Sequence, residues 1–172
     1  MMSERARTVV YTHRYDSPIG PLHLAVDRAG TVLQIGYTAP EVRRPGITVE
    51  ENKYACGELE HQLDAYFRGV LRRFTVATRV NGTPFQQRVW KRLAGIEYGS
   101  TVTYGEIARA LGHAGAARAV GNAVAVNPVP IVIPCHRVVA AGRRIGKYAL
   151  RSLPEDEGSH VKKRLLEFEG AL

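Results

Sequence analysis

The 172-residue sequence predicts an α/β fold of the α+β type: a small antiparallel sheet with one helix, followed by a mostly helical part that contains a helix-turn-helix. Two patterns support this. Apolar residues alternate with polar ones in the first third of the chain, and they follow helical spacing beyond position 83. The apolar fraction of 45% is enough to bury a core. We expect an antiparallel-sheet domain over residues 1–80 and a helix-turn-helix domain over residues 81–172.

The N-terminal sheet is expected to contain three strands separated by turn residues. Leu22, Leu24 and Val26 alternate as in a half-buried strand. The expected strands cover residues 9–15, 21–26 and 31–37. Residues 39–50, with two prolines and a glycine, predict a loop. Helical spacing then follows at Leu59, Leu63, Tyr66 and Phe67.

The second half begins after a short extended stretch at 72–80 and a linker at 81–82. Thr83 followed by Pro84 indicates an N-cap and a first helical residue. The apolar face of this helix is expected to hold Phe85, Val89, Trp90 and Leu93, and the helix is expected to end at 98–100. A capping-box pattern at 103–106 starts a second helix, and a third is expected over 115–126. A glycine turn at 112–113 between them is typical of a helix-turn-helix.

A final helix is expected after the charged stretch at 154–158. Its buried stripe should be formed by Val161, Leu165 and Phe168, which follow helical spacing.

The composition favours a polyanionic partner without requiring one. There are 24 Lys and Arg against 16 Asp and Glu, a net charge of +8. A basic domain suits nucleic acid, because neutralising phosphates releases counterions; a generically basic surface explains the charge equally well. No apolar run is long enough for a transmembrane helix, and the first residues do not resemble a signal peptide, so a cytoplasmic protein is expected. Two cysteines without paired spacing predict free thiols and no zinc site.

Cys135 is the candidate nucleophile. It follows an apolar run and Pro134, and it precedes His136. A cysteine is strongly nucleophilic only as the thiolate, and a histidine can take its proton. Neighbouring residues in an extended chain point to opposite sides, so a bridging water would be needed. The alternative, a small buried thiol, stays open on these grounds. Cys56 has no base nearby and is expected to be structural.

The segment around Cys135 resembles the active-site signature of the O6-alkylguanine-DNA alkyltransferase (methylated-DNA–protein-cysteine methyltransferase) family. The resemblance covers residues 83–169, and the N-terminal part matches only through SPIG at 17–20. The matching motifs, in order, are TYGE (103–106), ARAVG (117–121), NPVP (127–130), IPCHRV (133–138), GKY (146–148) and LLEFE (165–169). The family fold implies a ribonuclease-H-like N-terminal domain.

The resemblance implies a catalytic role for five residues. Cys135 would accept the alkyl group, His136 would act through a water as its base, and Glu169 would orient that histidine. Asn127 would tie the helix-turn-helix to the active-site loop, and the Tyr104 hydroxyl would assist departure of the guanine. Each has a plainer reading: Tyr104 as a core aromatic, Asn127 as a helix stop, and Glu169 as a solvated residue of the last turn, although a helix C-terminus disfavours a carboxylate.

The resemblance also implies DNA contacts and a substrate pocket. Arg118 would intercalate where the lesion base was, on a helix inserted into the minor groove. Arg118 could equally be a solvated arginine, and a small-residue face could serve tight helix packing; both readings can be partly true. The other implied DNA-binding residues are Ala117, Gly121, Thr103 and Arg137. The implied pocket residues are Val138, Tyr148, Ala149 and Leu150, and Leu150 stands where relatives often carry a smaller or polar residue.

The resulting hypothesis is irreversible transfer of one alkyl group per protein molecule. The partner would be duplex DNA that carries O6-alkylguanine, bound by a monomer with no cofactor, no metal and no membrane. A flipped-out nucleotide is required, because the alkyl carbon is otherwise inside the stack. A non-catalytic DNA-binding protein and a cysteine hydrolase are the competing interpretations. The residues do not decide whether O4-alkylthymine is also a substrate.

Overall fold

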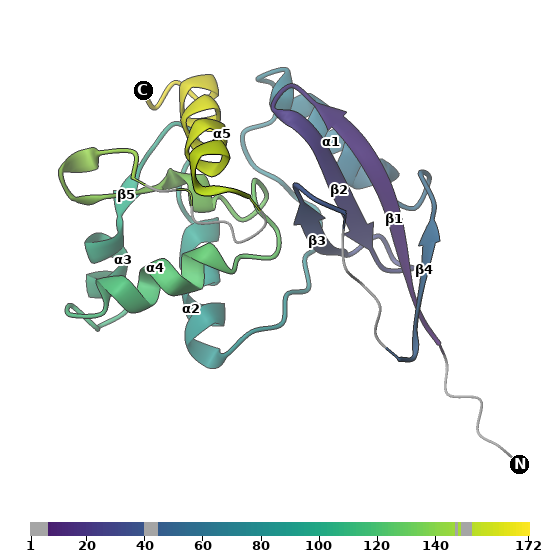
Figure 1. Ribbon diagram of the computed structural model, residues 1–172, viewed down its shortest axis with the longest axis horizontal. Coiled ribbons are helices and arrows are strands. Elements are labelled where there is room, and N and C mark those ends of the chain that lie inside the picture. Colours follow the sequence, from purple (N-terminus) through teal and green to yellow (C-terminus); the bar gives the residue numbers. More distant parts are fainter. Residues whose placement is uncertain (1–6, 40–44, 147, 149–152) are drawn as a thin grey trace, which may run out of the picture.

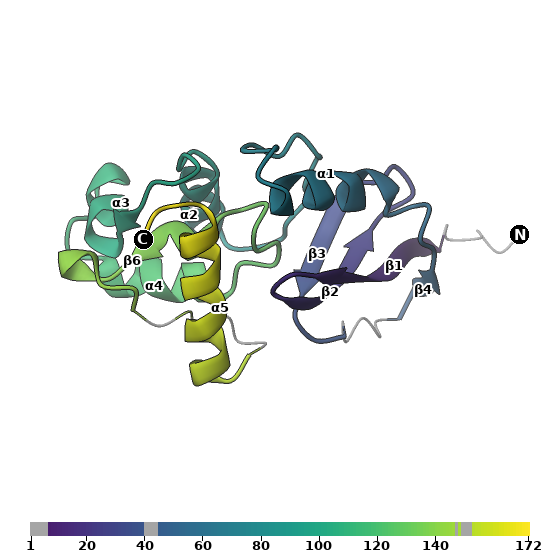
Figure 2. The same ribbon diagram turned by 90° about the horizontal axis from the view of Figure 1, so that it is seen from above.

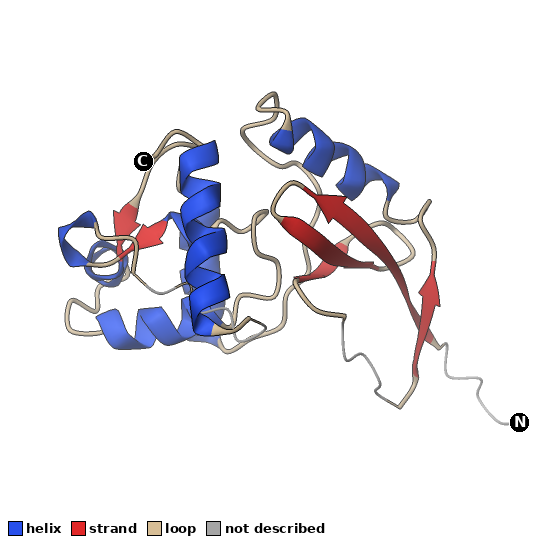
Figure 3. Ribbon diagram, turned by 45° about the horizontal axis from the view of Figure 1, so that its top comes forward, coloured by secondary structure: helices blue, strands red, loops and turns tan. Residues whose placement is uncertain are grey.

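The computed structural model describes residues 7–39, 45–146, 148 and 153–172. The four-stranded sheet and helix α1 occupy one half of the molecule, and the other helices gather in the other half (Figures 1 and 3), so the α+β fold class is confirmed. Within the described ranges no helix combines the length and the apolar character that crossing a bilayer requires.

The sheet has four strands in the order β3-β2-β1-β4. The expected strands correspond to β1 (Thr8–Ser17), β2 (Gly20–Val26) and β3 (Val32–Gly36), which pair antiparallel. The fourth strand, β4 (Ile47–Glu51), pairs parallel with β1. The expectation of a purely antiparallel sheet was therefore wrong, as was that of a loop through residue 50. No residue of β4 is buried, so no buried alternating face marked it in the sequence.

Helix α1 (Gly57–Phe67) covers one face of this sheet (Figure 2). The predicted stripe is correct for Leu59, Leu63 and Tyr66, all at most 1% exposed, while Phe67 is half-buried. The alternating residues of β2, which are Leu22, Leu24 and Val26, are fully buried.

The C-terminal half is built on helices α2 (Pro84–Ala94), α3 (Tyr104–Ala110) and α4 (Ala117–Ala125). Both predicted N-termini are confirmed: Thr83 forms a capping box with Gln86, and Thr103 forms one with Glu106. Helix α2 ends earlier than expected, because Gly95 is its C-cap and the chain turns there.

The predicted turn at Gly112 joins α3 to α4. Gly112 has φ of 78°, a left-handed conformation that favours glycine. Its N–H donates to the Arg109 carbonyl at 3.0 Å, and the N–H of His113 donates to the Ala108 carbonyl at 2.9 Å. These two bonds form a Schellman motif, which stops α3 and sends the chain into α4.

Two features bring distant segments to the loop that carries Cys135. Strand β5 (Val102–Thr103) pairs parallel with β6 (Val138–Val139), so the start of α3 lies beside this loop. Helix α5 (Glu155–Phe168) begins inside the charged stretch, and its acidic first turn suits the helix dipole. The expected stripe was wrong at Phe168, which is 38% exposed. The helix residues that are buried are Gly158, Val161, Lys162, Leu165 and Leu166.

Candidate active site

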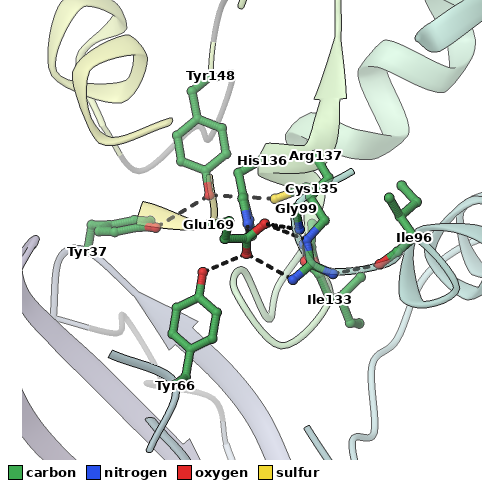
Figure 4. A network of polar contacts seen from close by, with 11 residues as sticks. Tyr37, Tyr66, Ile96, Gly99, Ile133, Cys135, His136, Arg137, Tyr148 and Glu169 are labelled. Atoms are coloured by element: carbon green, nitrogen blue, oxygen red, sulfur yellow. Dashed lines mark hydrogen bonds and ion pairs between the residues drawn. The ribbon is translucent and has the colours of Figure 1, made fainter. Parts of the chain in front are cut away.

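Cys135 begins a short 3₁₀ turn, η1 (Cys135–Arg137), and its side chain is buried, with 1% of the residue exposed. The Cys135 thiol donates to the Tyr148 hydroxyl at 3.8 Å, and the Tyr37 and Tyr148 hydroxyls lie 3.4 Å apart (Figure 4). The segment is therefore a turn and not an extended chain, so the argument that neighbouring side chains point to opposite sides does not apply. The side chains of Cys135, His136 and Arg137 are all buried.

Asn127 fixes the approach to this turn from the end of α4. Its Nδ2 donates to the Ile133 carbonyl at 2.8 Å, and its Oδ1 accepts from the Val129 N–H at 3.0 Å. Ile131 lies between these anchor points with φ of 74°, a strained conformation for a β-branched residue. One buried amide therefore holds a strained loop immediately before Cys135.

His136 is completely buried and binds Glu169, the C-cap of α5, with 2.7 Å between Nε2 and Oε1. The carboxylate can only accept, so Nε2 carries the hydrogen and Nδ1 is left with its lone pair. Nδ1 is buried and has no hydrogen-bond partner within the described ranges. Burial lowers the pKa of His136, and Glu169 opposes this shift. The resting imidazole is a neutral base with an available acceptor atom.

Arg137 does not occupy the DNA-binding role that the resemblance implied. It is 5% exposed, and its Nε and Nη2 donate to the two oxygens of Glu169 at 2.9 and 2.8 Å. Its Nη1 donates to the Ile96 carbonyl at 2.6 Å. Each of its three nitrogens donates a hydrogen bond inside the protein and the side chain is buried, so the expected phosphate contact is corrected: Arg137 forms a buried bidentate ion pair with Glu169.

Tyr66 brings the N-terminal half of the chain into the same network. Its hydroxyl donates to Glu169 Oε1 at 2.7 Å, and both groups are buried. The helical pattern identified Tyr66 only as a core position. The hydroxyl could have indicated a further role, because a buried tyrosine oxygen usually has a polar partner.

The surroundings of Cys135 act on its pKa in two directions. Burial raises the pKa of the thiol, while the hydrogen bonds that Asn127 and Tyr148 can donate to the thiolate and the charge of Lys162 act in the opposite direction. Desolvation of the sulfur outweighs these groups. Free Cys135 is therefore mainly the thiol, and a base must remove its proton.

Lys162 is the second residue that the sequence patterns did not identify. It is fully buried in α5, and its Nζ lies 5.9 Å from the centre of the Tyr104 ring. Burial lowers the pKa of Lys162 to about 8, and the charge of Cys135 opposes the shift. A cation is therefore held near the sulfur, where it favours the thiolate.

The implied pocket residues are only partly placed. Val138 is fully buried in β6, and Tyr148 adjoins the sulfur. Ala149 and Leu150 lie outside the described residues. A cavity of about 500 Å³ is lined by Tyr98, Pro134 and Arg137 among others. Cys135 does not line this cavity, so it is not the route to the sulfur.

The implied DNA-binding face lies on α3 and α4. Arg118 is exposed, and Ala117 and Gly121 are half-buried. A side chain at Gly121 would lie 3.9 Å from the Tyr104 ring, so this position packs against α3 as well as facing outward. Thr103 uses its hydroxyl to cap α3. No cluster of metal-ligating side chains occurs in the part of the chain that the structure describes.

Comparisons with known proteins point to a single family. Residues 84–171 match the model of the DNA-binding domain of 6-O-methylguanine DNA methyltransferase. A methylated-DNA–protein-cysteine methyltransferase of Mycobacterium leprae is 47% identical over 94% of this chain and 93% of its own length. A protein of the same name from Methanosarcina acetivorans is 39% identical over 94% of this chain and 99% of its own. The crystal structure of Mycobacterium tuberculosis OGT in complex with DNA superimposes with a TM-score of 0.77 at 40% identity, covering 95% of this chain and 93% of that one.

Proposed function

This chain belongs to the methylated-DNA–protein-cysteine methyltransferase family, and on that premise we propose that it repairs duplex DNA by moving the alkyl group of O6-alkylguanine onto Cys135. The observation that carries the proposal is the buried series Cys135, His136 and Glu169, in which the histidine presents an acceptor atom without a partner in the described structure.

The proposed reaction is a single displacement at the alkyl carbon. The proton of the Cys135 thiol passes through a bridging water to Nδ1 of His136, and the thiolate attacks the methyl carbon. The carbon–oxygen bond breaks, a carbon–sulfur bond forms, and the electron pair stays on guanine, which takes up one proton. The Tyr104 hydroxyl lies at the start of α3 and is proposed to supply that proton, which the His136 imidazolium restores through solvent. Proton uptake and release balance, so no cofactor is needed.

The product limits each molecule to one repair. A thioether is not reversed by disulfide exchange or by thiol reduction. Because a reduced thiol is required, the reducing cytoplasm is the proposed location, and one chain supplies every proposed catalytic residue, so a monomer suffices.

Access to the sulfur requires an extruded nucleotide, because Cys135 is buried and the lesion lies inside a base stack. We propose that α3 and α4 act as a helix-turn-helix with α4 in the minor groove. The exposed Arg118 on α4 would fill the space left by the base, offsetting part of the unstacking cost of a few kcal/mol.

The test is the intact mass of the full-length protein after incubation with duplex DNA that contains one O6-methylguanine. Wild-type protein should gain one methyl group, located on the Cys135 peptide, and reach one equivalent without further turnover. Cys135→Ser should gain nothing. Cys56→Ser is the matched control, since Cys56 is also buried but lies by the sheet; it should behave as wild type.

Three results would overturn the proposal. Lesion removal by the Cys135→Ser protein would exclude sulfur as the acceptor. DNA binding without a mass gain would indicate the non-catalytic alternative, and repeated turnover would indicate a hydrolase. The same assay with O4-methylthymine DNA decides whether that base is a second substrate.

The sequence supports one finer proposal about substrate size. Leu150 stands where relatives often carry a smaller or polar residue, and its larger side chain is proposed to slow transfer of bulky groups. Methyl transfer should therefore be faster than benzyl transfer, and equal rates for the two substrates would refute this idea.

A further inference from the structure

The carboxylate of Glu169 receives hydrogen bonds from both halves of the chain, and three of them reach one oxygen. Oε1 accepts from Tyr66 at 2.7 Å, His136 at 2.7 Å and Arg137 at 2.8 Å (Figure 4). We propose that Tyr66 is a positioning residue of the transfer site, whose hydroxyl shares Oε1 and thereby weakens the hold of Glu169 on the His136 proton. This inference deepens the proposed function and rests on it.

Tyr66 is not needed to aim the carboxylate. Arg137 already holds both oxygens of Glu169 through two parallel bonds, which fix the plane of the group. The N–H of Gly99 adds a longer contact of 3.5 Å to Oε2. Removing the Tyr66 hydroxyl therefore leaves Glu169 in place and changes mainly the charge that Oε1 presents to His136.

The direction of the effect follows from competition for one acceptor. Each donor on a carboxylate stabilises its charge and reduces what is left for the other donors. With Tyr66 present, Oε1 attracts the His136 Nε2 proton less, so the imidazolium is less stabilised. A less stabilised imidazolium gives up its proton more readily, which helps the imidazole return a proton once the thiolate has reacted.

Tyr66→Phe keeps the aromatic ring and replaces none of the other charged groups around this pair. Arg137 lies on the same turn as His136, and Lys162 faces it from α5. Tyr98, from the loop after α2, lies under the Arg137 guanidinium at 5.7 Å and interacts with the charge of Glu169. A change in the protonation of His136 after substitution at Tyr66 can thus be assigned to the missing hydroxyl.

The experiment follows the His136 ring by nitrogen-15 NMR in full-length protein with Cys135→Ser, which removes coupling to the thiol. In Tyr66→Phe the Nε2 proton should move downfield and the pKa of His136 should rise by about one unit, as expected for redistribution of one hydrogen bond to a charged group. Tyr15→Phe is the matched control: Tyr15 donates to Asp64 of the same helix α1 at 2.6 Å, remote from Glu169. It should leave both His136 signals unchanged.

A second variant separates this role from damage to the fold. Tyr66→3-fluorotyrosine keeps the shape and makes a stronger donor, so it should shift the Nε2 proton upfield and lower the pKa of His136. Loss of packing cannot produce shifts of opposite sign. Unchanged signals in both variants, shifts of the same sign, or an equal shift in Tyr15→Phe would overturn the inference.

The inference and the proposed function fail separately. The NMR measurement needs no alkylated DNA, whereas methyl transfer to Cys135 is read from the mass of the wild-type protein. If transfer occurs but the His136 signals do not respond, Tyr66 is only a packing residue.

Discussion

Replacement of Arg137 by methionine tests whether this residue is structural or binds DNA. The substitution keeps an unbranched side chain that fits the buried space. It removes three hydrogen-bond donors, of which two bind Glu169 and one binds the Ile96 carbonyl. Glu169 is 6% exposed, so its charge cannot be hydrated in compensation. Arg137→Met therefore leaves a buried anion that retains mainly His136 and Tyr66 as partners.

The expected loss of stability is large. Removing one partner of a buried ion pair costs about 3–5 kcal/mol. For a chain of this length each kcal/mol lowers Tm by about 2–4 °C, so a decrease of about 10 °C is expected. Adding Glu169→Gln to Arg137→Met removes the buried charge and should recover part of the loss, which gives a coupling energy from a double-mutant cycle.

The assay is urea unfolding at neutral pH, together with DNA binding over a range of salt concentrations. Arg72→Met is the matched control, because Arg72 lies over the same Tyr98 ring at 5.5 Å but is exposed. Its effect on stability should be within about 1 kcal/mol.

The opposite result would restore the role inferred from the family resemblance. Arg137 binds DNA, and the buried ion pair is refuted, if Arg137→Met has the urea midpoint of wild type and the slope of its DNA affinity against salt concentration falls by the amount expected for about one phosphate contact.

Three further predictions concern stability. Hydrogen bonds from His136 and Arg137 outweigh burial and hold the pKa of Glu169 below its usual range. The ionised carboxylate therefore stabilises the fold above about pH 4.3, and this contribution is lost as the pH falls toward the folded pKa. In Glu169→Gln the free energy of unfolding should fall less steeply with decreasing pH. The pKa of Lys162 is lowered to about 8, so the contribution of Lys162 to stability should rise between about pH 8 and 10.4. The urea midpoint of wild type should therefore increase relative to that of Lys162→Met over this pH range, and a constant difference would refute the prediction. A Cβ at Gly82 would lie 2.5 Å from the Trp90 ring, whereas one at Gly115 meets nothing within 4 Å. Gly82→Ala should therefore lose about 1–3 kcal/mol of unfolding free energy and Gly115→Ala should not. Equal urea midpoints for the two variants would refute the packing argument.

The sequence was most informative where local rules decide the structure. The caps at Thr83 and Thr103 and the turn at Gly112 depend on residues within one or two turns of each other, and all three are confirmed. The fold class followed from the change in hydrophobic period. The assignment of Cys135 as the nucleophile came from the family resemblance, since the residues around it left a buried structural thiol open.

Contacts between distant segments were beyond these rules. Nothing near Tyr66 in the sequence indicates that it meets Glu169, and β4 is recognised only through its pairing with β1. The resemblance implied that Arg137 contacts DNA, and no sequence pattern singled out Lys162. Both are buried, and a buried charge is tolerated when its partners are also buried, which only the tertiary structure reveals.

The contact between Tyr66 and Glu169 spans 103 positions of the chain, and that between Tyr37 and Tyr148 spans 111. Loop-closure entropy must be overcome before contacts of such high sequence separation contribute any stability, so they are slow to form. The helices can therefore assemble during folding before the environment of the sulfur is complete. The surroundings of the Cys135 thiol are therefore complete only when segments more than 100 positions apart have docked, so a substitution that weakens these contacts is expected to expose the thiol to oxidants as well as to slow repair.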